Sequence, residues 1–140
     1  MSARTGGCQC GAVRFRVEGD LGRASICHCR MCQKAFGSFY GPYVSTKPEH
    51  VTWTRGQRKL FASSNLVNRG FCGDCGTQLT FEGSGFFDIT IGAFDDPSDI
   101  RPTKQIGLEG KLPWVDELAN IPTPTPEEQA RTEAYPDHDT

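Results

Sequence analysis

The sequence predicts a mainly β domain built from several short strands and stabilised by metal. Short stretches alternate apolar and polar residues with the period of two that is typical of strands, and glycine-containing turn signals separate these stretches. Seven cysteines stand in C-x-C and C-x-x-C spacings, which are typical of metal sites in small domains. The chain of 140 residues suits one zinc-binding domain over residues 1–121. Residues 122–140 form a Pro-rich, acidic tail that we expect to be disordered.

The first expected elements precede and include the central cysteines. Residues 13–17 alternate valine and phenylalanine with two arginines, the pattern of a half-buried strand. A turn over residues 19–22 returns the chain to a short strand at Ser25 and Ile26. One or two helical turns over residues 28–36 should then end at Gly37.

The remaining expected elements are mostly strands. Their apolar residues are bounded by turn signals such as Arg55-Gly56, and Pro113 can begin a short closing helical turn. We expect strands over residues 39–45, 51–54, 59–62, 78–81 and 86–91, a loop over 94–99, and a helical turn over 113–118.

Charge and hydropathy exclude several classes of protein. The formal net charge is −2, and the last twenty residues hold five acidic residues against one arginine, so the rest of the chain is only mildly basic. Because no dense Lys/Arg block is present, we expect no nucleic-acid partner. No apolar run approaches the roughly 20 residues of a membrane-spanning helix. The first residues lack the apolar stretch of a signal peptide, so we expect a cytoplasmic protein without a membrane partner.

The cysteines are better explained as metal ligands than as disulfides. Thiols are kept reduced in the cytosol, and an odd number of cysteines cannot all pair. Soft thiolates in these spacings favour tetrahedral zinc.

Four of the cysteines can close one structural zinc site. Cys8 and Cys10 stand two apart, so on an extended segment both side chains would point to the same face. Cys72 and Cys75 form a compact C-x-x-C turn that can supply the other two ligands. This site would tie together distant parts of the chain and replace missing core.

The other three cysteines, Cys27, Cys29 and Cys32, are close enough in sequence to share a second zinc. Three protein ligands and an open position are typical of a catalytic zinc. A rival partition gives this trio His28 as a fourth ligand and leaves a poorer site elsewhere. Since His28 lies between two ligands, it should point away, and we expect a partly exposed or backbone-bonded imidazole.

The chemistry of a three-thiolate zinc points to a thiol substrate. Such an electron-rich ion should acidify water poorly, but it can hold a fourth thiol as thiolate, and this nucleophile can attack a carbonyl carbon. Arg30, Lys34 and Arg69 lie near the ligands in sequence and could bind the carboxylates of a glutathione-like molecule, although each could equally be an ordinary surface charge. Four aromatic residues could line the mouth of the site, but we expect most of them in the core: Phe36, Phe39, Tyr40 and Tyr43.

In the order of its cysteines, the chain resembles the glutathione-dependent formaldehyde-activating enzymes, the GFA or centromere-protein-V family. The resemblance runs from about Gly6 to about Pro122. Its motifs are Cys8-x-Cys10, Cys27-His28-Cys29-x-x-Cys32, Ser63-Ser64, Arg69-Gly70-Phe71-Cys72-x-x-Cys75-Gly76, Asp95-Asp96-Pro97, Arg101-Pro102-Thr103 and Trp114.

The resemblance implies a fold of several short, coiled antiparallel sheets, called β-tent or Mss-four-like. It also implies the same division of cysteines, with the quartet on a structural zinc and the trio on a catalytic zinc. The implied activity joins glutathione to formaldehyde as S-hydroxymethylglutathione, a carbon–sulfur lyase reaction in reverse. In one departure, Gln105 stands where many members carry a histidine.

We therefore expect a zinc-dependent carbon–sulfur lyase that acts on adducts of a small thiol, such as glutathione, with an aldehyde. The trio supplies three thiols where a closed zinc site needs four ligands, and this open position favours the enzyme. The alternative is a non-catalytic zinc module with a binding or structural role.

Overall fold

The computed structural model describes residues 3–129, and the described chain is mainly β, as predicted. The strands are β1 (Arg4–Gly7), β2 (Arg14–Val17), β3 (Ala24–Cys27), β4 (Gly41–Thr46), β5 (Val51–Arg55), β6 (Lys59–Ala62), β7 (Val67–Phe71), β8 (Gln78–Gly83), β9 (Phe86–Thr90) and β10 (Lys104–Ile106). The α-helices are α1 (Arg30–Phe36) and α2 (Pro126–Gln129), and the 3-10 helices are η1 (Pro48–His50), η2 (Ile91–Ala93), η3 (Leu108–Gly110) and η4 (Val115–Asn120).

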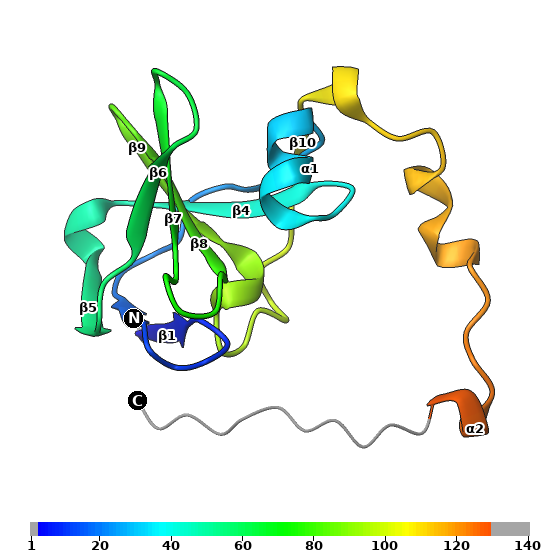
Figure 1. Ribbon diagram of the computed structural model, residues 1–140, viewed down its shortest axis with the longest axis horizontal. Coiled ribbons are helices and arrows are strands. Elements are labelled where there is room, and N and C mark those ends of the chain that lie inside the picture. Colours follow the sequence, from blue (N-terminus) through cyan, green and yellow to red (C-terminus); the bar gives the residue numbers. More distant parts are fainter. Residues whose placement is uncertain (1–2, 130–140) are drawn as a thin grey trace.

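Within the described residues the strands form two sheets. The smaller has the order β1-β2-β5, and the larger has the order β10-β3-β4-β9-β8-β7-β6. Neighbouring strands are antiparallel except for β10, which runs parallel to β3. Figure 1 shows α1 and β10 together at one end of β4, while the chain beyond the other end of β4 leads through η1 to β5. Helix α1, which carries part of the trio of cysteines, therefore lies at the opposite end of β4 from β5.

The main core lies between the two sheets. Its most buried large side chains include Phe15 from β2, Leu79 from β8 and Ile89 from β9, each at most 1% exposed. Cys8 and Cys72 belong to the same core cluster. A second, smaller cluster contains the buried Cys27, Cys32 and Tyr43.

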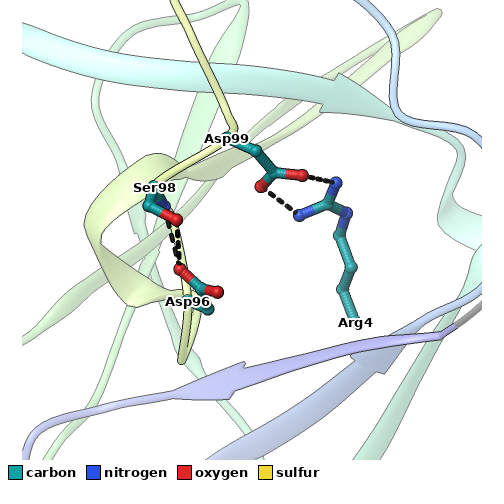
Figure 2. A network of polar contacts seen from close by, with 4 residues as sticks. All are labelled: Arg4, Asp96, Ser98 and Asp99. Carbon is teal, nitrogen blue, oxygen red and sulfur yellow. Dashed lines mark hydrogen bonds and ion pairs between the residues drawn. The ribbon is translucent and has the colours of Figure 1, made fainter.

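The predicted loop over residues 94–99 connects back to the N-terminal strand. The guanidinium of Arg4 donates to both carboxylate oxygens of Asp99, each at 2.8 Å (Figure 2). The same view shows Asp96 accepting from the amide and hydroxyl of Ser98, at 3.1 and 2.6 Å. The Arg4–Asp99 bonds connect the loop to β1, which also forms the isolated bridge between Gly6 and Phe94, while the Asp96–Ser98 bonds lie within the loop.

Most predicted elements are present, and three strands were not predicted. The helix ends at Gly37, which adopts the left-handed conformation at φ 57°. β1 and β7 contain glycine and polar residues in place of regular alternation, and the three-residue β10 exists only through its pairing with β3. The closing turn is the 3-10 helix η4, with Val115 buried.

The tail prediction is only partly within the described chain. Residues 122–125 have no regular structure and are exposed, and residues 126–129 form the four-residue α2. Residues 130–140 lie outside the described residues. None of the helices in the part that is described has the length and apolar character needed to cross a membrane.

Candidate metal centres

The structure gathers the seven cysteines into the two predicted groups. The quartet is Cys8, Cys10, Cys72 and Cys75, and its sulfur atoms all lie within 4.8 Å of one another. The Sγ atom of Cys10 is 3.6 Å from that of Cys8 and 3.8 Å from that of Cys72. A tetrahedron with Zn–S bonds of about 2.3 Å has edges of about 3.8 Å, so the donor set fits a zinc ion. All of the cysteines are free thiols.

Two turns supply the quartet. Cys8 and Cys10 lie in the turn between β1 and β2 and not on an extended segment, so the expected strand geometry is wrong. The turn nevertheless brings their two side chains together. The other pair lies in the turn between β7 and β8, where the amides of Asp74 and Cys75 donate to the Cys72 sulfur at 3.4 and 3.5 Å. Burial raises the pKa of Cys72, and these two amides, which favour the thiolate form, only partly oppose it.

The surroundings of Cys75 favour its ionised form. Burial raises the pKa of Cys75, but hydrogen bonds from the hydroxyl and amide of Thr77 outweigh it and lower the pKa to about 6. The Sγ of Cys75 lies 3.2 Å from the Thr77 hydroxyl. The quartet therefore contains a thiol that is ready to bind a cation near neutral pH.

The trio comes from one continuous segment. Cys27 ends β3, Cys29 is the N-cap of α1, and Cys32 lies in the first turn of that helix. The three sulfur atoms lie within 4.8 Å of one another, and no fourth His, Cys, Asp or Glu of the described residues joins them. Cys27 and Cys32 are buried, whereas Cys29 is half-buried, so the trio is accessible on the Cys29 side.

A buried tyrosine and a buried arginine contact the Cys32 sulfur. The hydroxyl of Tyr43 lies 3.2 Å from this sulfur, and an Nη of Arg69 lies 3.5 Å from it. Arg69 also donates to the hydroxyls of Tyr43 and Ser63, at 2.8 and 2.9 Å. The hydrogen bond from Cys27, followed by those from Tyr43 and Arg69, lowers the pKa of Cys32 to about 5 despite burial. These contacts therefore favour the thiolate form of Cys32 beside the positive charge of Arg69.

The segment after β10 covers the trio on one side. The side-chain amide of Gln33 donates to the carbonyl oxygens of His28 and Gly110, at 2.8 and 2.7 Å, and so joins α1 to η3. Gly107 has a φ of 66°, and a Cβ placed on it would lie 2.8 Å from the Cys29 amide nitrogen and 3.0 Å from the Cys27 sulfur. Only glycine allows this close approach.

His28 does not ligate with the trio, but its environment differs from the expected one. The imidazole is fully buried, and its Nε2 lies 2.8 Å from the side-chain oxygen of Gln105, so it is neither partly exposed nor bonded to backbone through this nitrogen. Gln105, the residue that departs from the family pattern, therefore contacts His28 and is absent from the trio. With its backbone amide bonded to the carbonyl of Ile106, His28 thus connects the residue after β3 to β10 at two points.

The three residues predicted to contact substrate line a single pocket. Arg30, Lys34 and Arg69 face a pocket of about 570 Å³ between α1 and the strands β6, β7 and β8. Arg30 and Lys34 are exposed, whereas Arg69 is buried, with only 5% of its surface exposed. Through Arg69 the pocket adjoins the trio. Substrate contact by these three residues remains a prediction.

Sequence reasoning did not find all the residues that shape the site. Of the four aromatic residues considered, Tyr43 is in the core as expected, but its contact with Cys32 was not predicted. The other three are half-buried, so the prediction that most of the four lie in the core is wrong. Phe36 packs edge-to-face against Tyr43, and Phe39 packs edge-to-face against Tyr40 and Trp114. Nothing in the sequence indicates that Gln33 contacts the segment after β10. For Gly107 the only indication is that glycine is often needed where φ is positive.

Comparisons with known proteins agree with the geometry. The chain is 32% identical over 114 residues to an uncharacterised lyase of Schizosaccharomyces pombe, covering 79% of this chain and 82% of the relative. It also resembles the crystal structure of a Rhodobacter sphaeroides protein with a TM-score of 0.53 and 20% identity, covering 72% of this chain and 98% of the other, which supports the fold alone. The family model of the glutathione-dependent formaldehyde-activating enzyme matches residues 3–109, a span that includes both cysteine groups. The chain therefore belongs to the GFA family.

Proposed function

We propose that the protein is a zinc-dependent carbon–sulfur lyase, which makes or breaks the bond between a small anionic thiol such as glutathione and the carbonyl carbon of an aldehyde. The observation that carries this proposal is the trio, three thiols without a fourth protein donor among the described residues, beside a cationic pocket. Family membership and the lyase naming of the yeast relative support the reaction class.

The two cysteine groups would hold one zinc ion each, with different roles. The quartet offers four thiolates and would hold a closed, structural zinc. The trio of Cys27, Cys29 and Cys32 would hold a catalytic zinc with room for one more donor. When bound there, zinc would supply the Lewis acidity that keeps a substrate thiol deprotonated at neutral pH.

The chain's own residues provide binding and charge balance. Arg69 places a positive charge beside the anionic trio, which makes the approach of a further thiolate less unfavourable. Arg30 and Lys34, at the pocket rim, are suited to the carboxylates of a glutathione-like molecule. In the forward reaction the substrate sulfur bonds to the carbonyl carbon, and the carbonyl oxygen takes up the proton that the thiol has lost. The nucleophile belongs to the substrate, so no nucleophilic side chain is required.

Thiol titration of the cobalt-substituted protein tests this function. Reduced glutathione should increase the thiolate-to-cobalt charge-transfer absorption, and the increase should be absent in the Cys29→Ser variant. S-methylglutathione, which has the same charges but no free thiol, is the matched control and should leave this absorption unchanged. If no small thiol perturbs the metal at millimolar concentration, the lyase assignment fails and a non-catalytic zinc module takes its place.

A further inference from the structure

The pocket beside the trio has walls that a hydrophilic thiol would not use. Its volume of about 570 Å³ lies in the range of sites for drug-sized ligands. The lining is mainly apolar, and its apolar members are Met31, Ala35, Phe61 and Phe71. A carbonyl compound as small as formaldehyde would add a single carbon to the thiol and would leave these walls unfilled.

Two of these side chains are large and strongly exposed. Phe61 on the edge strand β6 is 61% exposed, and Met31 in the first turn of α1 is 54% exposed. They face the same pocket from opposite walls, the sheet and the helix. Exposed apolar groups that gather around a cavity indicate a binding surface for an apolar group.

The charges of the same pocket indicate an anionic ligand. Arg30, Lys34 and Arg69 line it, and none of its lining residues is acidic. Arg69 extends from this lining to the Cys32 sulfur, 3.5 Å away. A ligand held by the cations would therefore have its reacting sulfur near the trio and its substituent against Phe61 and Met31.

We propose that the substrates are adducts of an anionic thiol with an apolar aldehyde, in which an alkyl or aryl substituent on the carbon bonded to sulfur occupies the pocket between Phe61 and Met31. This inference rests on the proposed function and specifies its electrophile. The reaction is balanced without a further reagent. The thiol and the aldehyde combine as a thiohemiacetal, the S–H bond and the carbonyl π bond are replaced by a C–S bond and an O–H bond, and the reverse reaction releases both partners.

Binding of inert adduct analogues to the zinc-loaded full chain tests the inference. The probes are S-methylglutathione and S-hexylglutathione, which carry identical charges and differ only in the apolar group, and their dissociation constants are measured by calorimetry. Each buried methylene can contribute about fourfold in affinity, so the hexyl compound should bind at least about tenfold more tightly. Phe61→Ala and Met31→Ala should each reduce this ratio severalfold. Lys34→Ala should weaken both compounds to the same extent.

A matched control separates the pocket from general surface hydrophobicity. Leu66, in the connection between β6 and β7, is 73% exposed and lies outside the pocket lining, so Leu66→Ala should preserve the ratio. Equal affinity for the two compounds, or an equal loss in Leu66→Ala and Phe61→Ala, would overturn the inference. This failure is distinct from failure of the lyase assignment, which would appear as an unchanged cobalt spectrum on addition of free glutathione.

Discussion

Arg69 is a buried cation whose nearest anionic partner is a thiolate. Its guanidinium donates to the hydroxyls of Ser63 and Tyr43, approaches the Cys32 sulfur at 3.5 Å and lies 4.9 Å above the ring of Phe81. A buried charge is unfavourable unless it is paired and hydrogen-bonded, and these contacts satisfy that requirement. The residue therefore positions Cys32 in addition to lining the pocket.

Arg69→Lys should weaken metal binding at the trio while retaining the positive charge. Lysine lacks the planar fork that reaches two hydroxyls and a sulfur at once. Loss of such an outer partner typically costs about 10–100-fold in metal affinity, and we expect a loss in this range. Competition with a chromophoric chelator measures it, and Arg23→Lys, at an exposed position, is the control. Unchanged metal affinity in Arg69→Lys would show that the guanidinium does not position Cys32.

The segment formed by β10 and η3 packs against the trio, although it lies far from the three cysteines in the sequence. The amide of His28 donates to the carbonyl of Ile106 at 2.9 Å, and Gln33 connects α1 to Gly110. At Gly107 this segment comes so close to Cys27 and Cys29 that a side chain has no space. The ligand geometry thus depends on a long-range contact.

Gly107→Ala should impair the trio and leave the quartet intact. The new Cβ would meet the Cys29 amide at 2.8 Å and require a left-handed alanine, which costs about 1–2 kcal/mol. We expect the metal at the trio to be lost at chelator concentrations that wild type withstands, with a fall of only a few degrees in the thermal midpoint. Gly92→Ala, where a Cβ meets nothing within 4 Å, is the matched control. Equal metal retention in both variants would show that the segment does not constrain the trio.

The sequence predicts those elements whose own residues show the pattern of a helix, strand or metal site. It does not predict elements that form only through contact with a distant part of the chain. The helix from Arg30 to Phe36 was predictable because Gly37 ends it, and the cysteine spacings predicted both groups. β10 was not predictable, because three exposed residues become a strand only by pairing with β3. The contact of Tyr43 with Cys32 likewise depends on the register between strands, which local pattern does not specify.

At the scale of the whole molecule, the two cysteine groups differ in what they hold together. The quartet joins the turn after β1 to the turn after β7, and Cys8 and Cys72 belong to the main core. The trio lies within one segment of the chain and in a smaller apolar cluster. Metal binding at the quartet should therefore contribute far more to folding than metal binding at the trio.

Cysteine-to-serine variants should reveal this difference in thermal melts. Cys75→Ser should unfold the domain or lower its thermal midpoint strongly, because binding energy at a structural zinc is largely folding energy. Cys29→Ser should fold with a midpoint close to wild type but lose one metal ion and any lyase activity. The opposite order of stabilities would mean that the two groups have exchanged roles.

The central claim, one closed and one open zinc site, is tested most directly by a chelator titration of the zinc-loaded full chain, with zinc release and circular dichroism recorded together. We predict two steps. The first zinc should leave at low chelator concentration without change in the β-sheet signal, and the second should leave only at higher concentration, together with unfolding. Cys29→Ser should lack the first step alone. Release of both ions in a single step that coincides with unfolding would contradict the division of the seven cysteines into a structural and a catalytic site.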